Sequence, residues 1–242
     1  KILHKKIVEL KPEFTNVLLI SSDLNETIDE ISKIKCKNLI YLSQYEIFKK
    51  EFFKNKSYNV VYADFDDLPF KKKSFDLVIS NFCTNKVLEK KNYLKKILDI
   101  LTDDGLFLCN FFGEQTLREL RQCFFIADDQ FLSGAFNRIP RVDLMADFSN
   151  LLAEVGYNEI VTEKVNFDIF YKSIIGILKD IKNMGEKIPI IEKKEKISKT
   201  YIHFLNKIYI KEFANQNRQL KVTLDIISIS SWKKLKNNSK NQ

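Results

Sequence analysis

The chain has 242 residues and 45% of them are hydrophobic, so one domain with an insertion can bury a sizeable core. The net charge of +8 comes from lysines spread along the whole chain, which is typical of a solvated lysine-rich surface. The sequence has no helix-turn-helix pattern and no aromatic–basic RNA motif, so nucleic acid is not the expected partner. No apolar run approaches the roughly 20 residues of a membrane-spanning helix, and no signal peptide is visible. Because the chain opens at Lys1 rather than at methionine, we expect that an upstream segment is missing.

Cysteine and histidine usage argues against a structural metal. The four cysteines have no CxxC or paired spacing, and each lies in or beside an apolar run: Cys36, Cys83, Cys109 and Cys123. We therefore predict buried free thiols in a reducing compartment. The only two histidines, at positions 4 and 203, do not form a ligand set with them, so no metal site is expected.

The amino-terminal quarter alternates helical and strand patterns. The predicted elements are a helix over 1–10, a strand over 16–20, a helix over 26–34, a strand over 38–42 and a helix over 45–55. The loop after the first strand reads Ser21-Ser22-Asp23-Leu24-Asn25, and no glycine precedes Gly105. Serine, aspartate and asparagine form turns and cap helices, so the missing glycines leave this strand–helix connection possible.

The stretch 58–113 has the clearest pattern in the chain. It predicts a strand over 58–63, an acidic loop over 64–70, a strand over 75–80, an amphipathic helix over 87–101 and a strand over 106–111. Strand, loop, strand, helix and strand in this order predict a doubly wound parallel sheet. Ligands of such sheets bind beyond the carboxyl ends of the strands, which is where the acidic loop lies.

Three motifs in this stretch resemble the class I S-adenosylmethionine (SAM)-dependent methyltransferases. They are the loop from Asp64 to Phe70, the strand Phe75-Asp76-Leu77-Val78 and the turn Asp104-Gly105. The resemblance implies a Rossmann-like α/β fold with a seven-stranded sheet in the order 3-2-1-4-5-7-6. The seventh strand is antiparallel, and helices cover both faces.

The second half resembles one subgroup of that family, the mitochondrial complex I assembly-factor methyltransferase-like proteins and their bacterial relatives, which include biotin-synthesis methyltransferases. The matching segments are 112–121 (FGEQTLRELR), 147–157 (DFSNLLAEVGY), 178–186 (LKDIKNMGE) and 229–233 (ISSWK). In the first segment, Thr116 and Glu119 have the spacing of a capping box, which predicts that a helix begins there. Gly156 is predicted to end a helix. Surface ion pairing is the favoured explanation of Arg118 and Arg121.

The resemblance implies SAM as the cofactor and assigns residues to its site. The expected cofactor residues lie at strand ends and in the acidic loop: Ser21, Ser22, Leu42, Ser43, Asp64, Phe65 and Ser80. Asp64 would accept a hydrogen bond from the adenine amino group, and Phe65 would stack on or edge the ring. The expected substrate residues are Asn81, Asn85 and Arg118. No catalytic residue is named, because methyl transfer depends chiefly on proximity and orientation.

Three departures from the family pattern leave two functions open. The first loop has no glycine, so side chains would enter the space of the methionine part of the cofactor. No acidic residue follows Leu42 to bind the ribose hydroxyls, and only Ser43 or Gln44 could replace it. Asn85-Lys86 stands where the subgroup has His-Trp. The chain is therefore either a SAM-dependent methyltransferase-like protein of the complex I assembly type or a non-catalytic assembly factor that no longer binds SAM. Hydroxylation in a repurposed pocket is a further enzyme class left open.

We expect a single methyltransferase-like domain over 1–232, with a helical insertion over about 167–215, and a basic disordered tail over 233–242. The insertion either caps the pocket or only packs on the sheet. The expected partner is a protein or carrier-protein substrate, and the resemblance implies a respiratory-complex subunit as one candidate. The expected location is the bacterial cytoplasm, or the mitochondrial matrix if the source is eukaryotic.

Overall fold

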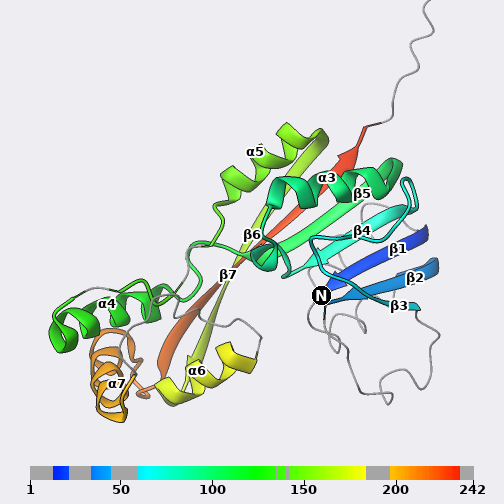
Figure 1. The fold of residues 1–242 in the computed structure, drawn as a ribbon. Coiled ribbons are helices and arrows are strands. Elements are labelled where there is room, and N and C mark those ends of the chain that lie inside the picture. The colour runs from blue at the N-terminus through cyan, green and yellow to red at the C-terminus, as the bar shows by residue number, and fades with distance from the viewer. Residues whose placement is uncertain are drawn as a thin grey trace, which may run out of the picture. The chain divides into compact units, whose positions relative to one another are not determined.

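The computed structural model describes residues 13–21, 34–44, 59–134, 136–139, 142–183 and 197–234. Figure 1 shows its elements in order. They are β1 (Phe14–Ser21), β2 (Cys36–Ser43), β3 (Asn59–Tyr62), β4 (Phe75–Asn81), the short 3-10 helix η2 (Thr84–Lys86), α3 (Lys90–Ile100), β5 (Leu101–Phe112), α4 (Arg118–Leu132), α5 (Met145–Val155), β6 (Tyr157–Tyr171), α6 (Ile174–Asn183), α7 (Lys199–Phe213) and β7 (Leu220–Lys233). The helices predicted over 1–10, 26–34 and 45–55 lie outside the described residues.

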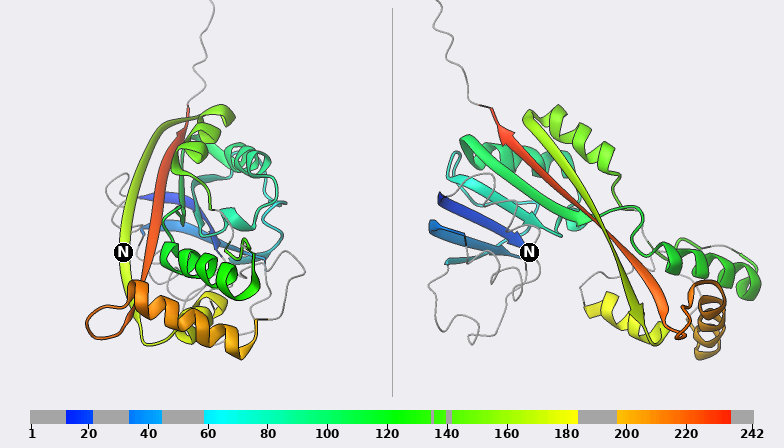
Figure 2. Two further views of the ribbon diagram at one scale, coloured as in Figure 1. Left: turned by 90° about the vertical axis from the view of Figure 1, so that its left-hand side faces the viewer. Right: turned by 180° about the vertical axis from the view of Figure 1, so that it is seen from behind.

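The chain divides into two compact units. Unit 1 comprises residues 1–111, 144–163 and 227–242, and unit 2 comprises 112–143 and 164–226. The long strands β6 and β7 lie side by side and belong to both units (Figure 2). The helices predicted for the insertion are α6 and α7. None of the described helices is long and apolar enough to cross a membrane.

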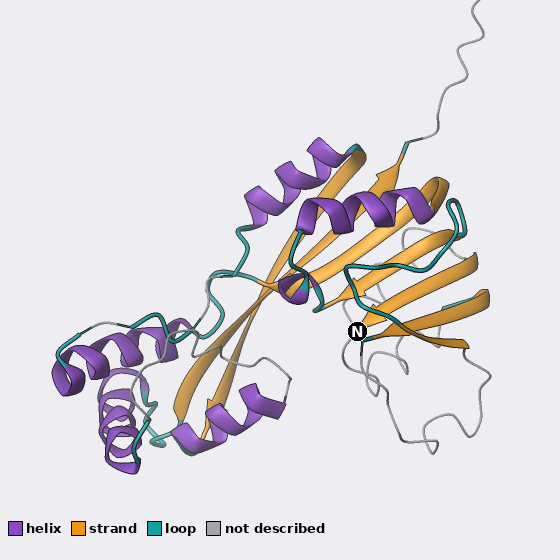
Figure 3. Ribbon diagram, viewed as in Figure 1, coloured by secondary structure: helices purple, strands orange, loops and turns teal. Residues whose placement is uncertain are grey.

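The described strands form one seven-stranded sheet in the order β3-β2-β1-β4-β5-β7-β6, which confirms the predicted topology. β1 pairs in parallel with β2 and β4, β2 with β3, and β4 with β5, whereas β7 is antiparallel (Figure 3). Continuous apolar runs build the central strands because both faces of such a sheet are buried. Val17, Leu18, Leu19 and Ile20 of β1 are accordingly all inaccessible to solvent.

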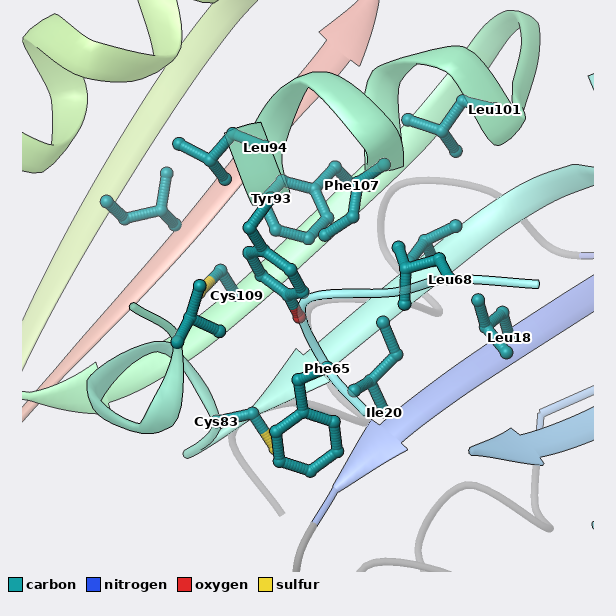
Figure 4. Packing of buried hydrophobic residues seen from close by; sticks show 14 of the residues in the cluster. Leu18, Ile20, Phe65, Leu68, Cys83, Tyr93, Leu94, Leu101, Phe107 and Cys109 are labelled. Atoms are coloured by element: carbon teal, nitrogen blue, oxygen red, sulfur yellow. The ribbon is translucent and has the colours of Figure 1, made fainter. Parts of the chain in front are cut away.

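The two faces of the sheet in unit 1 each carry an apolar core. On one face, α3 and α5 pack on the sheet through Tyr93, Leu94, Phe148 and Leu152, together with strand residues such as Phe107 (Figures 3 and 4). On the other face, alternate residues of the same strands gather in a second cluster: Phe14, Val17, Leu19, Ile34, Tyr41, Leu77, Ile79, Leu106 and Leu108. Three thiols, at Cys83, Cys109 and Cys123, are buried and free, as predicted, and that of Cys36 is free and half-buried.

The predicted turn Asp104-Gly105 lies within β5 rather than before it. The pairing register between β4 and β5 jumps from Phe75–Leu101 to Leu77–Leu106, so extra residues of β5 bulge out of the ladder. Asp104 has a φ of 63°. A Cβ at Gly105 would lie 2.9 Å from the carbonyl oxygen of Thr102, so glycine is required at this close approach.

Unit 2 has its own core, formed between α4, α6, α7 and the adjoining part of β7. Its members include Leu120, Phe124, Ile177, Leu205 and Val222. A fully buried Asp128 on α4 lies within this unit and pairs with Arg138 at 2.6 Å. The hydroxyl of Tyr201 on α7 donates to the same carboxylate at 2.5 Å. This charge network therefore ties α4, α7 and the loop after α4 together.

The capping box predicted at Thr116 and Glu119 is wrong. α4 begins at Arg118, its amino-terminal cap is Leu117 with a φ of 58°, and no side chain caps it. The Thr116 hydroxyl instead donates to the carbonyl oxygen of Asp225 on β7 at 2.9 Å and accepts from its backbone N–H at 3.0 Å. Both residues are thus used to attach the start of α4 to a strand.

The structure also tests the predicted end of α5 and the predicted start of the helical insertion. Gly156 ends α5 with a φ of 111°, and its N–H donates to the carbonyl oxygens of Leu152 and Ala153, so the predicted helix end is confirmed. The helical insertion predicted from about residue 167 begins later, because β6 continues to Tyr171 and includes Phe170. β6 is an edge strand, and Phe170 is 45% exposed on it.

Candidate functional site

The carboxyl ends of β1, β2, β3 and β4 meet at one edge of the sheet. The register places Ile20 beside Leu42, Ser21 beside Asn81, and Ser43 beside Tyr62. In a parallel sheet, strands that end at the same level place their last residues side by side. Four of the predicted cofactor positions, Ser21, Leu42, Ser43 and Ser80, are therefore neighbours in space although 59 residues separate the first from the last.

Three buried serines mark this edge. Ser21, Ser43 and Ser80 are 0%, 1% and 0% exposed, although serine is seldom fully buried in proteins. The carbonyl oxygen of Ser21 accepts from the Tyr41 hydroxyl at 2.5 Å, and that of Ser43 accepts from the Ala63 N–H at 3.1 Å. These contacts fix the backbone where each strand ends.

Ser80 is engaged by a tyrosine from α3. Its hydroxyl lies 2.9 Å from that of Tyr93, which is buried in the core (Figure 4). Burial raises the pKa of the Tyr93 phenol well above its usual value, and the nearby Cys83 acts in the same direction. The Ser80 hydrogen bond opposes this shift only in part. Tyr93 is therefore protonated at neutral pH and serves as a hydrogen-bonding group rather than as a base.

Of the two cofactor residues predicted in the acidic loop, Asp64 is exposed and Phe65 is buried. Asp64 is exposed, and its Oδ1 accepts from the Asp66 N–H at 3.0 Å, which forms a turn. Its other carboxylate oxygen has no partner among the residues that the structure describes, so it is available as an acceptor. Phe65 is fully buried and lies against Ile20 and Cys83 in the core (Figure 4).

Hydrogen bonds and an ion pair hold the acidic loop against neighbouring residues of unit 1. Asp66 Oδ2 accepts from the Leu88 N–H at 3.3 Å, and the Lys96 ammonium donates to the Asp66 carbonyl oxygen. The same ammonium lies 3.5 Å from an Asp67 carboxylate oxygen. These contacts anchor the loop at Asp66 and Asp67, although the Asp67 side chain is 87% exposed.

Leu42 and Ser22 complete the predicted cofactor set. Leu42 is fully buried with its side chain in the core, so only its backbone can contact a ligand. Ser22 lies outside the described residues.

The predicted substrate residues Asn81 and Asn85 lie just after the buried part of β4. Asn81 is 8% exposed, and its Oδ1 accepts from the Asn110 side-chain amide at 3.0 Å. Asn85 is exposed in η2. Asn110 on β5 was not among the predicted site residues. The available signal was an amide residue within an otherwise apolar run of that strand, residues 106–112.

Arg118 belongs to unit 2 and pairs with Glu119 at 3.2 Å, as its interpretation as an ion-pairing residue predicts. Glu119 is 1% exposed and accepts from the Thr223 N–H at 3.0 Å and from its hydroxyl at 2.6 Å. Burial by itself raises the pKa of the Glu119 carboxyl, but its hydrogen bonds, of which those from Thr223 contribute most, together outweigh burial and leave the pKa below its usual value. Glu119 is therefore an ionised structural residue at neutral pH.

Among the residues that the structure describes, no three histidine, cysteine, aspartate or glutamate side chains are grouped as a metal site would need. The polar groups at this edge of unit 1 include hydroxyls, amides and the exposed carboxylates of Asp64 and Asp67. Such groups are suited to hydrogen-bonding an uncharged or cationic organic ligand.

Residues 36–109 match the family model of the methyltransferase domain. The chain is 26% identical over 173 residues to "Arginine-hydroxylase NDUFAF5, mitochondrial" of Danio rerio, which covers 72% of this chain and 54% of that protein. It is 33% identical over 106 residues to the malonyl-[acyl-carrier protein] O-methyltransferase of Nitrosospira multiformis, which covers 42% of this chain and 33% of that enzyme. The chain spans about half, or less, of the length of the curated relatives it matches.

Solved structures share the fold at low identity. The YcgJ protein of Bacillus subtilis has a TM-score of 0.63 at 16% identity, covering 96% of this chain and 97% of that one. A Haemonchus contortus N-methyltransferase, solved with S-adenosylhomocysteine and phosphomonomethylethanolamine, has a TM-score of 0.56 at 12% identity and covers 96% of this chain and 52% of that one. These likenesses agree with the topology of the sheet.

Proposed function

We propose, from the premise that this chain carries a methyltransferase-type domain and is similar to the NDUFAF5 proteins, that it binds SAM and acts in the assembly of respiratory complex I. The observation that carries the proposal is the row of buried serines at the joined carboxyl ends of β1, β2 and β4. Polar side chains buried at this edge, beside an exposed acceptor on Asp64, suit a nucleoside ligand in an open α/β sheet.

The residues present fit the adenosine part of SAM better than its methionine part. Asp64 retains a carboxylate oxygen for the adenine amino group, and the Ser43 hydroxyl can form a neutral hydrogen bond with the ribose. Ser21 and Ser22 stand where family members have glycine, so the methionine part has less room. When bound, SAM would supply a methyl group on a sulfonium, and this chain would position the acceptor.

Two alternatives have specific support. The missing glycines, the missing ribose-binding acid and Asn85 in place of histidine favour a non-catalytic assembly factor on the same fold. The name of the NDUFAF5 relatives favours hydroxylation of an arginine, and it suggests a protein substrate rather than a small molecule. The similarity to a carrier-protein methyltransferase supports a carrier protein as another substrate class.

The relatives named as mitochondrial suggest the mitochondrial matrix as the location if the source is eukaryotic. For a bacterial source, the cytoplasmic side of the respiratory membrane is where a complex I subunit would be met during assembly. A respiratory-complex subunit is accordingly the partner that we propose.

Complementation in cells tests the function. Removal of the gene should reduce assembled complex I, and the wild-type chain should restore it. Asp64→Asn keeps the acceptor of the turn at Asp66 but replaces the second oxygen with a donor, so it should weaken adenine binding without unfolding the loop. If cofactor binding is needed, Asp64→Asn restores less complex I. Full restoration by Asp64→Asn would favour the non-catalytic alternative, and normal complex I without the gene would contradict the proposal.

A further inference from the structure

Among the buried oxygen atoms of unit 1 that have no hydrogen-bond partner in the described residues, two lie near the carboxyl ends of β4 and β5: Oγ1 of Thr84 and Oδ1 of Asn110. Thr84 is fully buried and Asn110 is 7% exposed. Buried polar atoms in native proteins are nearly always hydrogen-bonded, so each exception requires a physical explanation. A ligand or a bound water that donates to these oxygens would supply it.

The two residues lie on segments that are joined to each other. Asn110 pairs with Asn81 across β4 and β5, and its Nδ2 donates to the Asn81 side chain at 3.0 Å. The N–H of Phe82, the next residue, donates to the Asn110 carbonyl oxygen at 2.9 Å. Thr84 follows two residues later, and its carbonyl oxygen accepts from the Val87 N–H at 3.4 Å. The backbone of Thr84 is thus used within η2 while its hydroxyl is unused.

The backbone between these residues is strained. Phe82 has a φ of 52°, in the left-handed region that a bulky side chain rarely adopts. Such conformations persist where the surrounding structure enforces them, and they are concentrated at functional sites. Phe82 directly follows β4, at the edge of the sheet where ligands of this fold bind.

The unused hydrogen-bonding capacity of Thr84 and Asn110 determines which ligand group fits the two side chains. One N–H of the Asn110 amide donates to Asn81, and the amide oxygen Oδ1 is the unused acceptor. The Thr84 hydroxyl can accept as well as donate. A group with N–H donors satisfies both oxygens, whereas a carboxylate or phosphate would place an acceptor against the Asn110 carbonyl.

We propose that Thr84 and Asn110 form a polar subsite for an N–H group of the substrate, with Asn81 as the positioning residue that orients the Asn110 amide. This inference rests on the proposed function only in taking the carboxyl edge of unit 1 as the ligand site. The subsite selects an amide or amine N–H group over an anionic one.

Nuclear magnetic resonance on the full chain with two small amides tests the subsite. N-methylacetamide has one N–H donor, and N,N-dimethylacetamide has the same carbonyl group without a donor. At matched millimolar concentrations, N-methylacetamide should shift the side-chain amide signals of Asn110 in the wild type and in Thr84→Ser, which keeps the hydroxyl. It should not shift them in Thr84→Val, and N,N-dimethylacetamide should not shift them in any of the three proteins.

Thermal unfolding without ligand separates a ligand subsite from a structural water site. If the hydroxyl has no partner in the free protein, Thr84→Val should have an unchanged or higher Tm, because an unsatisfied buried oxygen is removed. A Tm lowered by several degrees would show that the hydroxyl is already satisfied and would overturn the proposal. Equal shifts with both amides, or none with either, would also overturn it. None of these measurements requires SAM, so a chain that fails to bind SAM can still have the subsite.

Discussion

The phenol of Tyr41 on β2 donates a hydrogen bond of 2.5 Å to the backbone carbonyl oxygen of Ser21, the last residue of β1. Tyr41 is 1% exposed, so this bond is shielded from water. It fixes the end of β1 at the position where the class I methyltransferases that the sequence resembles begin a glycine-rich loop. The end of this strand is therefore held by a side chain from the neighbouring strand.

Replacing Tyr41 with phenylalanine removes only the donor. We expect Tyr41→Phe to lower the free energy of unfolding by about 0.5–1.5 kcal/mol, the usual net contribution of one hydrogen bond. Urea unfolding measures this change in the free energy of unfolding. Tyr62→Phe, on the half-exposed Tyr62 of β3, is the matched control and should change stability by at most about 0.5 kcal/mol. Equal effects of the two substitutions would contradict a specific role for the Tyr41 hydroxyl.

Restoring an acid at the end of β2 should strengthen cofactor binding. A charged acceptor gains about 1 kcal/mol over a neutral one in a hydrogen bond, so Ser43→Asp should bind S-adenosylhomocysteine roughly fivefold more tightly. Ser43→Asn has nearly the same shape without the charge and should show no such gain. Calorimetric titration of both variants measures the difference. If Ser43→Asp binds no more tightly than Ser43→Asn, Ser43 does not face the ribose.

The depressed pKa of Glu119 predicts how stability depends on pH. An acid with a lowered folded-state pKa stabilises the protein above its unfolded-state pKa, and this contribution is lost as the pH falls through the folded-state value. The advantage of the wild type over Glu119→Gln, about 1–3 kcal/mol at pH 7, should therefore shrink below pH about 4.5.

Unfolding curves from pH 7 to pH 3 test this prediction. Glu114→Gln changes an exposed carboxyl in the same segment and should not alter the pH dependence. A constant difference between the wild type and Glu119→Gln over the whole range would show that ionisation of Glu119 does not stabilise the fold.

The buried ion pair of unit 2 should be costly to break. Arg138→Met leaves the Asp128 carboxylate buried without its cation, which typically costs about 3–5 kcal/mol. Lys211→Met breaks an ion pair whose lysine is 83% exposed, and its expected cost is at most about 1 kcal/mol. Urea unfolding, monitored by a probe in unit 2, measures the loss of stability in each variant. Similar small losses for both would mean that the Asp128 charge is not isolated from solvent by the fold.

The sheet could be predicted because its strands are apolar runs bounded by turn residues. Both faces of the central strands are buried, so their sequences are continuous apolar runs, and such runs predict strands. The runs are Val17–Ile20, Phe75–Ser80 and Leu106–Phe111. The order of the strands came from motifs such as the segment Phe75–Val78, which follows the acidic loop. The start of the helical insertion was less accurate, since β6 continues to Tyr171 and residues 167–171 are strand rather than helix.

The site was predicted less completely because long-range contacts decide it. Thr116 and Glu119 have the spacing of a capping box, but their partners on β7 are 109 and 104 residues away in sequence. Phe65 looked like a ring-stacking residue, yet it is fully buried in this structure because a neighbouring core accepts it. Asn110 could be recognised only after the register of β4 and β5 placed it beside Asn81.

Calorimetric titration of the wild-type chain with S-adenosylhomocysteine tests the central claim most directly. The account predicts binding in the micromolar range, weakened in Asp64→Asn, because the serine-lined strand ends and Asp64 still form an adenosine site. No heat of binding and no rise in Tm at millimolar ligand would contradict it, and would leave the chain as an assembly factor that has kept the fold without the cofactor.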